Sequence, residues 1–306
     1  MTNFTIELDT DSDVHVVDGR QAVDSDDLSK GLQNYERPNN LTEEYLPIRN
    51  VKVELLPSDD QEQKTHWLLA EIYEEHLGKG EATSKNRSLA GKIRSRGKSD
   101  DDCGHIIACS LGGKMVDFNL FPQNKNINRG FKGWKNHWRR GIEHLIYIWL
   151  KKRFCHNPHV QFQVRFFYTD RQYPNRPHHG KFLIHFKGSD SGANMKVNNL
   201  DKNQCSTEVY TRLKGVLQNV IENELEPVAE PNYEKVISKA LSEFDNVSCE
   251  QFQHFILLLM NDFKKDEQQP STSTSSSYRP IPAPLKSKRF LQKTINTYIV
   301  ISLGVH

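Results

Sequence analysis

The sequence of 306 residues contains few cysteines and no long apolar run. Its five cysteines are an odd number spread thinly along the chain, which excludes the dense disulfide framework of a small secreted domain and favours a reducing compartment. No stretch of about eighteen apolar residues is present, so we predict no membrane span and no membrane partner. The first residues lack a basic segment followed by an apolar run, so no secretory signal is predicted. These absences together favour an intracellular protein of the cytoplasm or the nucleus.

Apolar residues are also scarce. They make up 36% of the chain, and the mean hydropathy of -0.70 indicates that part of the chain is not packed into a core. We predict an acidic, mostly disordered segment over residues 1–45 and a low-complexity linker with a basic tail over residues 266–306. Between them we expect a folded domain over residues 46–200 and a helical appendage over residues 201–265. Two or three amphipathic helices are predicted within residues 206–265, which could bind a protein partner.

Charge is segregated along the chain, although the net charge is only +2. Residues 1–62 hold fifteen acidic and five basic residues, a balance of -10, whereas residues 92–153 hold five acidic and fourteen basic residues, a balance of +9. A block of positive charge favours a surface for a polyanion, because clustered cations displace counterions from phosphate backbones. The ordinary alternative is a solvated basic face with no ligand.

The spacing of apolar residues predicts helices and strands in one domain. Apolar residues separated by three or four positions predict a packing helix over residues 65–76 and a second helix over residues 126–153. Residues 48–57 predict a short strand. Strict alternation predicts an antiparallel pair over residues 160–169 and 181–188, joined by a loop with two prolines. The expected fold class is therefore α+β, with an antiparallel sheet.

One stretch, DDCGHIIACSLGGKMVDFNLFPQNKNIN (residues 101–128), places a histidine and several asparagines around two glycines. Its apolar segments at residues 105–111 and 118–121 flank the turn signal Gly112-Gly113, which predicts a strand, a turn and a strand before the helix. Hydrolysis of a phosphodiester in such a ββα frame needs a base for water, a cation for the developing charge and donors for the phosphate. Histidine, with an ordinary pKa of about 6.5, suits the base, and asparagine oxygen suits Mg²⁺.

Three blocks of this region resemble the signature of the DNA/RNA non-specific endonuclease family, the ββα-metal nucleases. They are DCGH (residues 102–105), NLFPQ (residues 119–123) and NRG (residues 128–130). The family has Asp-Arg-Gly-His, Asn-x-x-Pro-Gln and Asn-x-Gly at these places. The Leu-Gly-Gly turn at residues 111–113 resembles the toxin-like bacterial branch of the family. The likeness covers residues 85–190 and implies a ββα-metal motif within the α+β fold.

The resemblance also implies roles for particular residues. His105 would be the general base, Asn119 would orient the site, and Asn128 would be the protein ligand of a hydrated Mg²⁺, for which Mn²⁺ could substitute. The implied activity is a metal-dependent, sequence-tolerant hydrolysis of DNA and/or RNA to 5′-phosphate ends. The basic side chains expected to bind the nucleic acid are Arg94, Lys132, Lys135 and Arg140.

The sequence departs from the family pattern at two positions. Cys103 stands where the family has the arginine of Asp-Arg-Gly-His, so a cation that contacts phosphate must come from elsewhere. The candidates are Arg94, Arg96 and Arg139. The family also has a glutamate on the helix, near the position of Asn136 or Trp138 here, and Glu143 lies farther down the helix. These losses give an alternative function, a catalytically weakened nuclease fold that acts as a nucleic-acid or protein binding module.

Each site residue also has an ordinary explanation. His105 could be a buried strand histidine with a hydrogen-bonded ring, Asn119 could make an Asx-turn, and Asn128 could cap a helix. The spacing of Cys103, His105 and Cys109 leaves a zinc site open, although it lacks paired Cys-x-x-Cys spacing. A fourth zinc ligand would have to come from one of three histidines, His137, His144 or His156.

Overall fold

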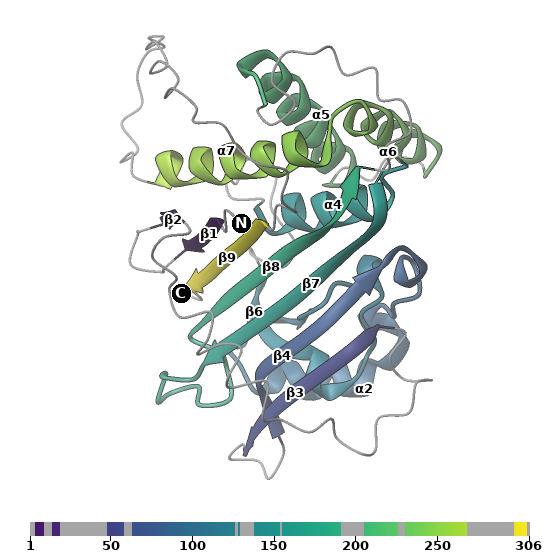
Figure 1. The fold of residues 1–306 in the computed structure, drawn as a ribbon. Helices are drawn as coiled ribbons and strands as arrows, with labels where there is room; N and C mark the ends of the chain where they lie inside the picture. Colours follow the sequence, from purple (N-terminus) through teal and green to yellow (C-terminus); the bar gives the residue numbers. More distant parts are fainter. Residues whose placement is uncertain are drawn as a thin grey trace, which may run out of the picture.

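The computed structural model describes residues 4–8, 14–18, 48–57, 63–125, 128, 138–153, 155–190, 205–225, 230–267 and 297–304. Within these ranges, the chain forms a seven-stranded sheet, a two-stranded sheet and five α-helices (Figure 1). The expected α+β class with an antiparallel sheet is confirmed. Among the described residues, no helix is both long enough and apolar enough to span a membrane.

The large sheet has the strand order β2-β1-β9-β8-β7-β4-β3. Its strands are β1 Phe4–Leu8, β2 Val14–Asp18, β3 Arg49–Pro57, β4 Gln63–Tyr73, β7 Cys155–Phe167, β8 His179–Asp190 and β9 Thr297–Gly304. All neighbours pair antiparallel except β1 and β9, which are parallel. The strands that we predicted at residues 48–57, 160–169 and 181–188 are therefore confirmed as β3, β7 and β8.

The small sheet pairs β5 (Asp101–His105) with β6 (Leu120–Asn124), and helix α2 (Arg87–Ser95) packs against both strands. Helix α4 (Trp138–Leu150) packs against β7. The remaining helices are α5 (Thr207–Leu225), α6 (Glu230–Asp245) and α7 (Cys249–Glu267). These last three confirm the helices predicted for residues 206–265.

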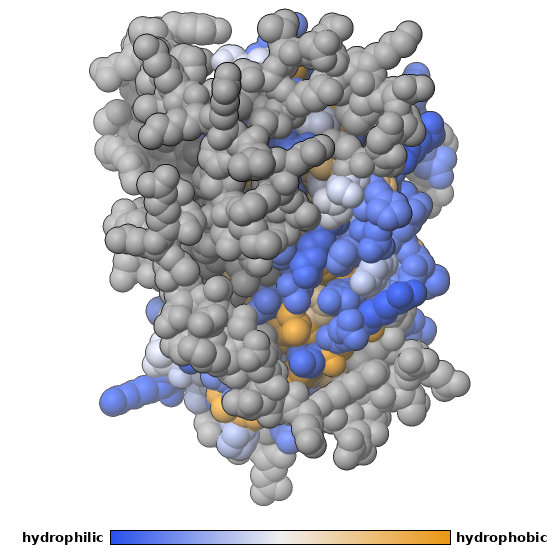
Figure 2. Space-filling model, in the orientation of Figure 1, coloured by the Kyte–Doolittle hydropathy of each residue, from blue (hydrophilic) through white to orange (hydrophobic). Residues whose placement is uncertain are grey.

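The helix predicted over residues 65–76 is wrong, because most of this segment is strand β4. Leu68, Ala70 and Ile72 alternate into the core, as a strand between β3 and β7 requires. Trp67 is buried on the other face, where the guanidinium of Arg165 lies 4.5 Å from its ring centroid. Because apolar residues of β4 are buried on both faces, they do not simply alternate with polar residues along the strand. Their spacings of three and four positions resembled those of a helix. Where the described residues are visible in Figure 2, this side of the molecule is mostly hydrophilic, with apolar atoms showing between the polar residues.

Two other predicted boundaries shift. The first strand of the ββ pair ends at His105 rather than beginning there, and residues 106–119 form a loop with two short 3-10 turns. The helix predicted over residues 126–153 is confirmed from Trp138 as α4, whereas residues 126, 127 and 129–137 lie outside the described part.

One hydrophobic core joins the large sheet to all three C-terminal helices. Trp149 on α4 contacts the rings of Phe186 on β8 and Phe252 on α7. The buried Lys152 ammonium donates hydrogen bonds to the carbonyl oxygens of Phe244 at 3.0 Å and Val247 at 2.6 Å, at the end of α6. The predicted boundary between residues 200 and 201 therefore does not divide the core.

The predicted disordered segment and tail concern residues that lie largely outside the described part. Two short stretches within residues 1–45 are the strands β1 and β2, and one stretch within residues 266–306 is the strand β9. The division of the chain into four parts stays a prediction.

Candidate active site

The ββ pair places His105 at the end of a short strand. It lies opposite Leu120, and Gly104 lies opposite Phe121. A Cβ on Gly104 would come within 2.2 Å of Oε1 of the buried Gln123. The glycine before His105 therefore leaves the space that the Gln123 side chain fills.

Asn119 holds the loop that follows His105. Its Oδ1 accepts a hydrogen bond from the Ile107 N–H at 2.9 Å, and its Nδ2 donates to the carbonyl oxygens of Ile107 at 3.2 Å and Lys114 at 3.1 Å. These contacts span the loop rather than the next residues of the chain, so they do not form an Asx-turn. They are the contacts expected of a residue that orients the site, and that role stays a prediction.

The two glycines of this loop serve close packing rather than a hairpin turn. Gly112 has a φ of 99°, a left-handed backbone conformation that residues with a side chain rarely adopt. A Cβ on Gly113 would lie 1.7 Å from the carbonyl oxygen of Ile107, and a Cβ on Gly80 would lie 2.0 Å from that of Cys109. Two loops, residues 77–82 and 108–115, therefore meet backbone against backbone beside His105.

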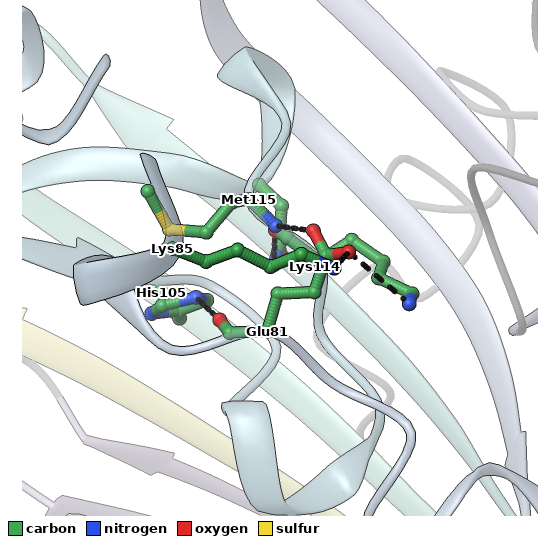
Figure 3. Close-up of polar contacts among 6 residues, drawn as sticks. Glu81, Lys85, His105, Lys114 and Met115 are labelled. Carbon is green, nitrogen blue, oxygen red and sulfur yellow. Dashed lines mark hydrogen bonds and ion pairs between the residues drawn. The ribbon is translucent and has the colours of Figure 1, made fainter. Parts of the chain in front are cut away.

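This loop contact fixes the imidazole of His105. Its Nε2 lies 2.9 Å from the carbonyl oxygen of Glu81 (Figure 3), and the residue is only 8% exposed. Because a carbonyl oxygen can only accept, Nε2 carries the hydrogen of this bond. In the neutral ring, Nδ1 then keeps the lone pair that can accept a proton. Glu81 could not be predicted from residue types, because the contact uses its backbone carbonyl and no side-chain motif encodes it.

Asn128 lies beside the same small sheet. Its Nδ2 donates to Oδ2 of the buried Asp102 at 3.1 Å, which brings an amide and a carboxylate together. Both groups offer hard oxygen donors, the type that Mg²⁺ prefers. Within the described ranges, no three His, Cys, Asp or Glu side chains form a group that could hold a metal ion, so Cys103, His105 and Cys109 do not make the zinc site considered above. A hydrated Mg²⁺ with one or two protein oxygens needs no such group.

Residues 71–188 match the model of a known family, described as DNA/RNA non-specific endonuclease. This part of the chain is therefore similar to the DNA/RNA non-specific endonuclease family. The matched endonuclease segment begins in β4 and ends in β8, so it includes the ββ pair, His105 and Asn128. It extends farther toward the N-terminus than the likeness that we read from the motif blocks. No curated protein matches the chain.

At position 103 the family motif has an arginine, whereas this chain has a buried cysteine. Its side chain packs in a small cluster with residues of α2, including Ala90 and Ile93. Burial raises the pKa of the thiol to about 11, so it is neutral at physiological pH, and the positive charge of Arg94 is the largest effect that opposes this rise. Arg94 is exposed on α2, the helix that packs against the strand of Cys103.

Arg96, another candidate for the phosphate contact, is held in an ion pair, and its role stays a prediction. Its guanidinium binds Asp117 through two hydrogen bonds of 2.9 and 3.2 Å, and its side chain is 5% exposed. A contact with phosphate would require this ion pair to open. For Arg139 and Arg140 only the helical backbone of α4 is described, and Lys132 and Lys135 lie outside the described part. Their roles stay predictions.

Proposed function

We propose that the endonuclease segment hydrolyses DNA and/or RNA phosphodiester bonds in a metal-dependent reaction that leaves 5′-phosphate ends. At the level of the family, the match supports a hydrolytic, non-specific DNA/RNA endonuclease. The observation that carries the proposal is the hydrogen bond of 2.9 Å between His105 Nε2 and the Glu81 carbonyl, because it leaves Nδ1 as a proton acceptor.

In the proposed reaction, Nδ1 of His105 accepts a proton from a water molecule as the water oxygen attacks phosphorus. The bond between phosphorus and the 3′ oxygen breaks. The phosphate therefore stays on the 5′ oxygen of the downstream nucleotide, and the released 3′ oxygen takes a proton from solvent. Asn128, with Asp102 beside it, would hold a hydrated Mg²⁺, for which Mn²⁺ could substitute. When bound, the ion supplies positive charge that offsets the charge on the phosphate and the leaving oxygen.

The test of this function is cleavage of plasmid DNA and of a long RNA by the full chain with Mg²⁺, with Mn²⁺ and with EDTA. We expect cleavage with either ion and none with EDTA, and the products should be substrates for an exonuclease that requires a 5′ phosphate. Cleavage that persists in EDTA, or products with 3′-phosphate ends, would show that the proposed chemistry is wrong.

We propose further that Arg94 supplies the phosphate contact that Cys103 lacks. It is exposed, and its charge acts on the Cys103 thiol, whereas Arg96 is engaged by Asp117. Arg94→Ala is expected to lower kcat/KM about 10-fold, less than the loss of a buried transition-state donor, because an exposed cation is partly screened. The matched control is Arg87→Ala, which removes the same charge from the exposed face of α2 two turns away. Equal losses in the two variants would mean that only overall charge matters.

The buried Cys103 and the Arg96–Asp117 ion pair favour the second candidate, a binding module on the endonuclease fold. Such a module would cleave neither substrate with either ion, yet it would bind nucleic acid with an affinity that falls steeply with salt concentration. The cleavage assay and a binding titration at two salt concentrations therefore separate the candidates.

A further inference from the structure

Glu81 is attached to the site through three separate groups. Its carbonyl oxygen accepts the His105 Nε2 hydrogen bond, and its backbone N–H donates to the carbonyl oxygen of Gly113 at 2.9 Å. Its carboxylate reaches back over the same loop, where Oε2 accepts a hydrogen bond from the Met115 N–H at 3.2 Å and Oε1 lies 3.4 Å from the Lys114 ammonium (Figure 3). The residue therefore links the imidazole to residues 113–115.

Among the described residues, none pairs with the segment around Glu81 as a neighbouring strand. It lies between two 3-10 turns, Glu74–His76 and Thr83–Asn86. The position of its carbonyl oxygen therefore depends on the contacts of Glu81 itself and on the close approach of Gly80 to Cys109. A shift of this carbonyl would release Nε2 of His105, and the imidazole could then exchange its tautomers.

We propose that the Glu81 carboxylate is a positioning residue for the general base. By binding the Met115 N–H, it fixes the carbonyl that keeps the hydrogen on Nε2 of His105 and the lone pair on Nδ1. This inference rests on the proposed nuclease function for its effect on catalysis, but not for its effect on the tautomer. Hydrogen bonding by Lys85 is the main cause that lowers the pKa of Glu81, so the carboxylate stays ionised at neutral pH and accepts strongly.

Two conservative variants separate the reach of the side chain from its charge. Glu81→Gln removes the charge but keeps an oxygen at the same distance from Cα, so it can still accept from the Met115 N–H. Glu81→Asp keeps the charge but is shorter by one carbon–carbon bond, about 1.5 Å, so it loses this contact. We expect kcat to fall about 10-fold in Glu81→Asp with little change in KM, and to stay close to the wild-type value in Glu81→Gln. Glu81→Ala should behave as Glu81→Asp does.

The tautomer of His105 provides a readout that does not need activity. Long-range ¹H–¹⁵N spectra of histidine-labelled protein, recorded above neutral pH, should show hydrogen on Nε2 in the wild type and in Glu81→Gln. Mixed tautomers are expected in Glu81→Asp and Glu81→Ala. The His105 signals are assigned by their loss in His105→Ala. Glu74→Ala is the matched control. It removes an exposed carboxylate that lies seven positions before Glu81 and pairs with Lys151 rather than with the site.

Several results would overturn the inference. Full activity in Glu81→Asp with a loss in Glu81→Gln would show that charge matters and reach does not. A single Nε2–H tautomer in all variants would show that the carboxylate does not position the ring, whatever the rates are. If the wild-type protein cleaves no nucleic acid, the proposed function fails, but the comparison of tautomers still decides the role of Glu81.

Discussion

Replacement of His105 by alanine is expected to lower kcat for plasmid cleavage by about 10²–10⁴, the usual contribution of a general base. The physical reason is the loss of the Nδ1 lone pair, the only acceptor that the Glu81 contact leaves on the neutral ring. Affinity for nucleic acid should change little, because it depends on exposed cations rather than on a buried imidazole. The measurements are single-turnover cleavage with Mg²⁺ and a binding titration with EDTA.

The control for the loss of a histidine is His156→Ala, which alters an exposed residue of β7 in the same endonuclease segment and should cleave at the wild-type rate. Added imidazole should restore part of the activity of His105→Ala, because the small molecule can take the place of the missing base. Cleavage by His105→Ala within a few-fold of the wild-type rate would show that this residue is not the base.

Replacement of Arg176 by methionine is expected to lower the free energy of unfolding by about 3–5 kcal/mol. Arg176 and Asp101 form an ion pair in which both side chains are 1% exposed, with Nε at 2.6 Å from Oδ2 and Nη2 at 3.1 Å from Oδ1. The pair ties the loop between β7 and β8 to the first residue of β5. Methionine fills part of the space but leaves the Asp101 carboxylate buried without its cation, which carries most of the cost. Urea unfolding monitored by circular dichroism measures the change.

Two variants calibrate this prediction. Arg153→Met breaks an ion pair with Asp245 in which the arginine side chain is 83% exposed, so it should cost no more than about 1 kcal/mol. Asp101→Asn added to Arg176→Met should recover part of the loss, because the buried group is then neutral. A cost of less than about 1 kcal/mol for Arg176→Met would mean that water or another cation replaces the guanidinium.

Much of the fold could be predicted from the sequence where one face of an element is buried. Apolar residues recur at every second position through most of β7 and less regularly in β8, and the three C-terminal helices keep a helical period. Strand β4 could not be predicted in this way, because Trp67 is buried on the face opposite to Leu68. Its burial depends on Arg165 of β7, a residue 98 positions away, and no local pattern contains that contact.

Some residues of the candidate site could be predicted from the sequence, and some of its contacts could not. His105 and Asn128 were predictable because their residue types and spacing follow a family motif. Two contacts of the site were not predictable from the sequence, because each forms only when segments far apart in the chain meet. They are the contact of Arg96 with Asp117 and that of His105 with the Glu81 carbonyl. The group that contacts His105 is a backbone carbonyl, which every residue type has, so the residue type at position 81 does not reveal this contact. A prediction based on residue types therefore finds His105 but not the backbone carbonyl that its imidazole contacts.

The shared core decides which parts of the chain can be separated from each other. The family match ends at residue 188, yet Trp149 and Phe186 within it pack on Phe252 outside it, and the Lys152 ammonium finds its acceptors at the end of α6. A gene segment limited to the match would encode a chain with an exposed aromatic cluster and a lysine without these acceptors. The endonuclease segment and the three helices therefore cover each other's buried side chains, and we expect them to unfold together as one cooperative unit.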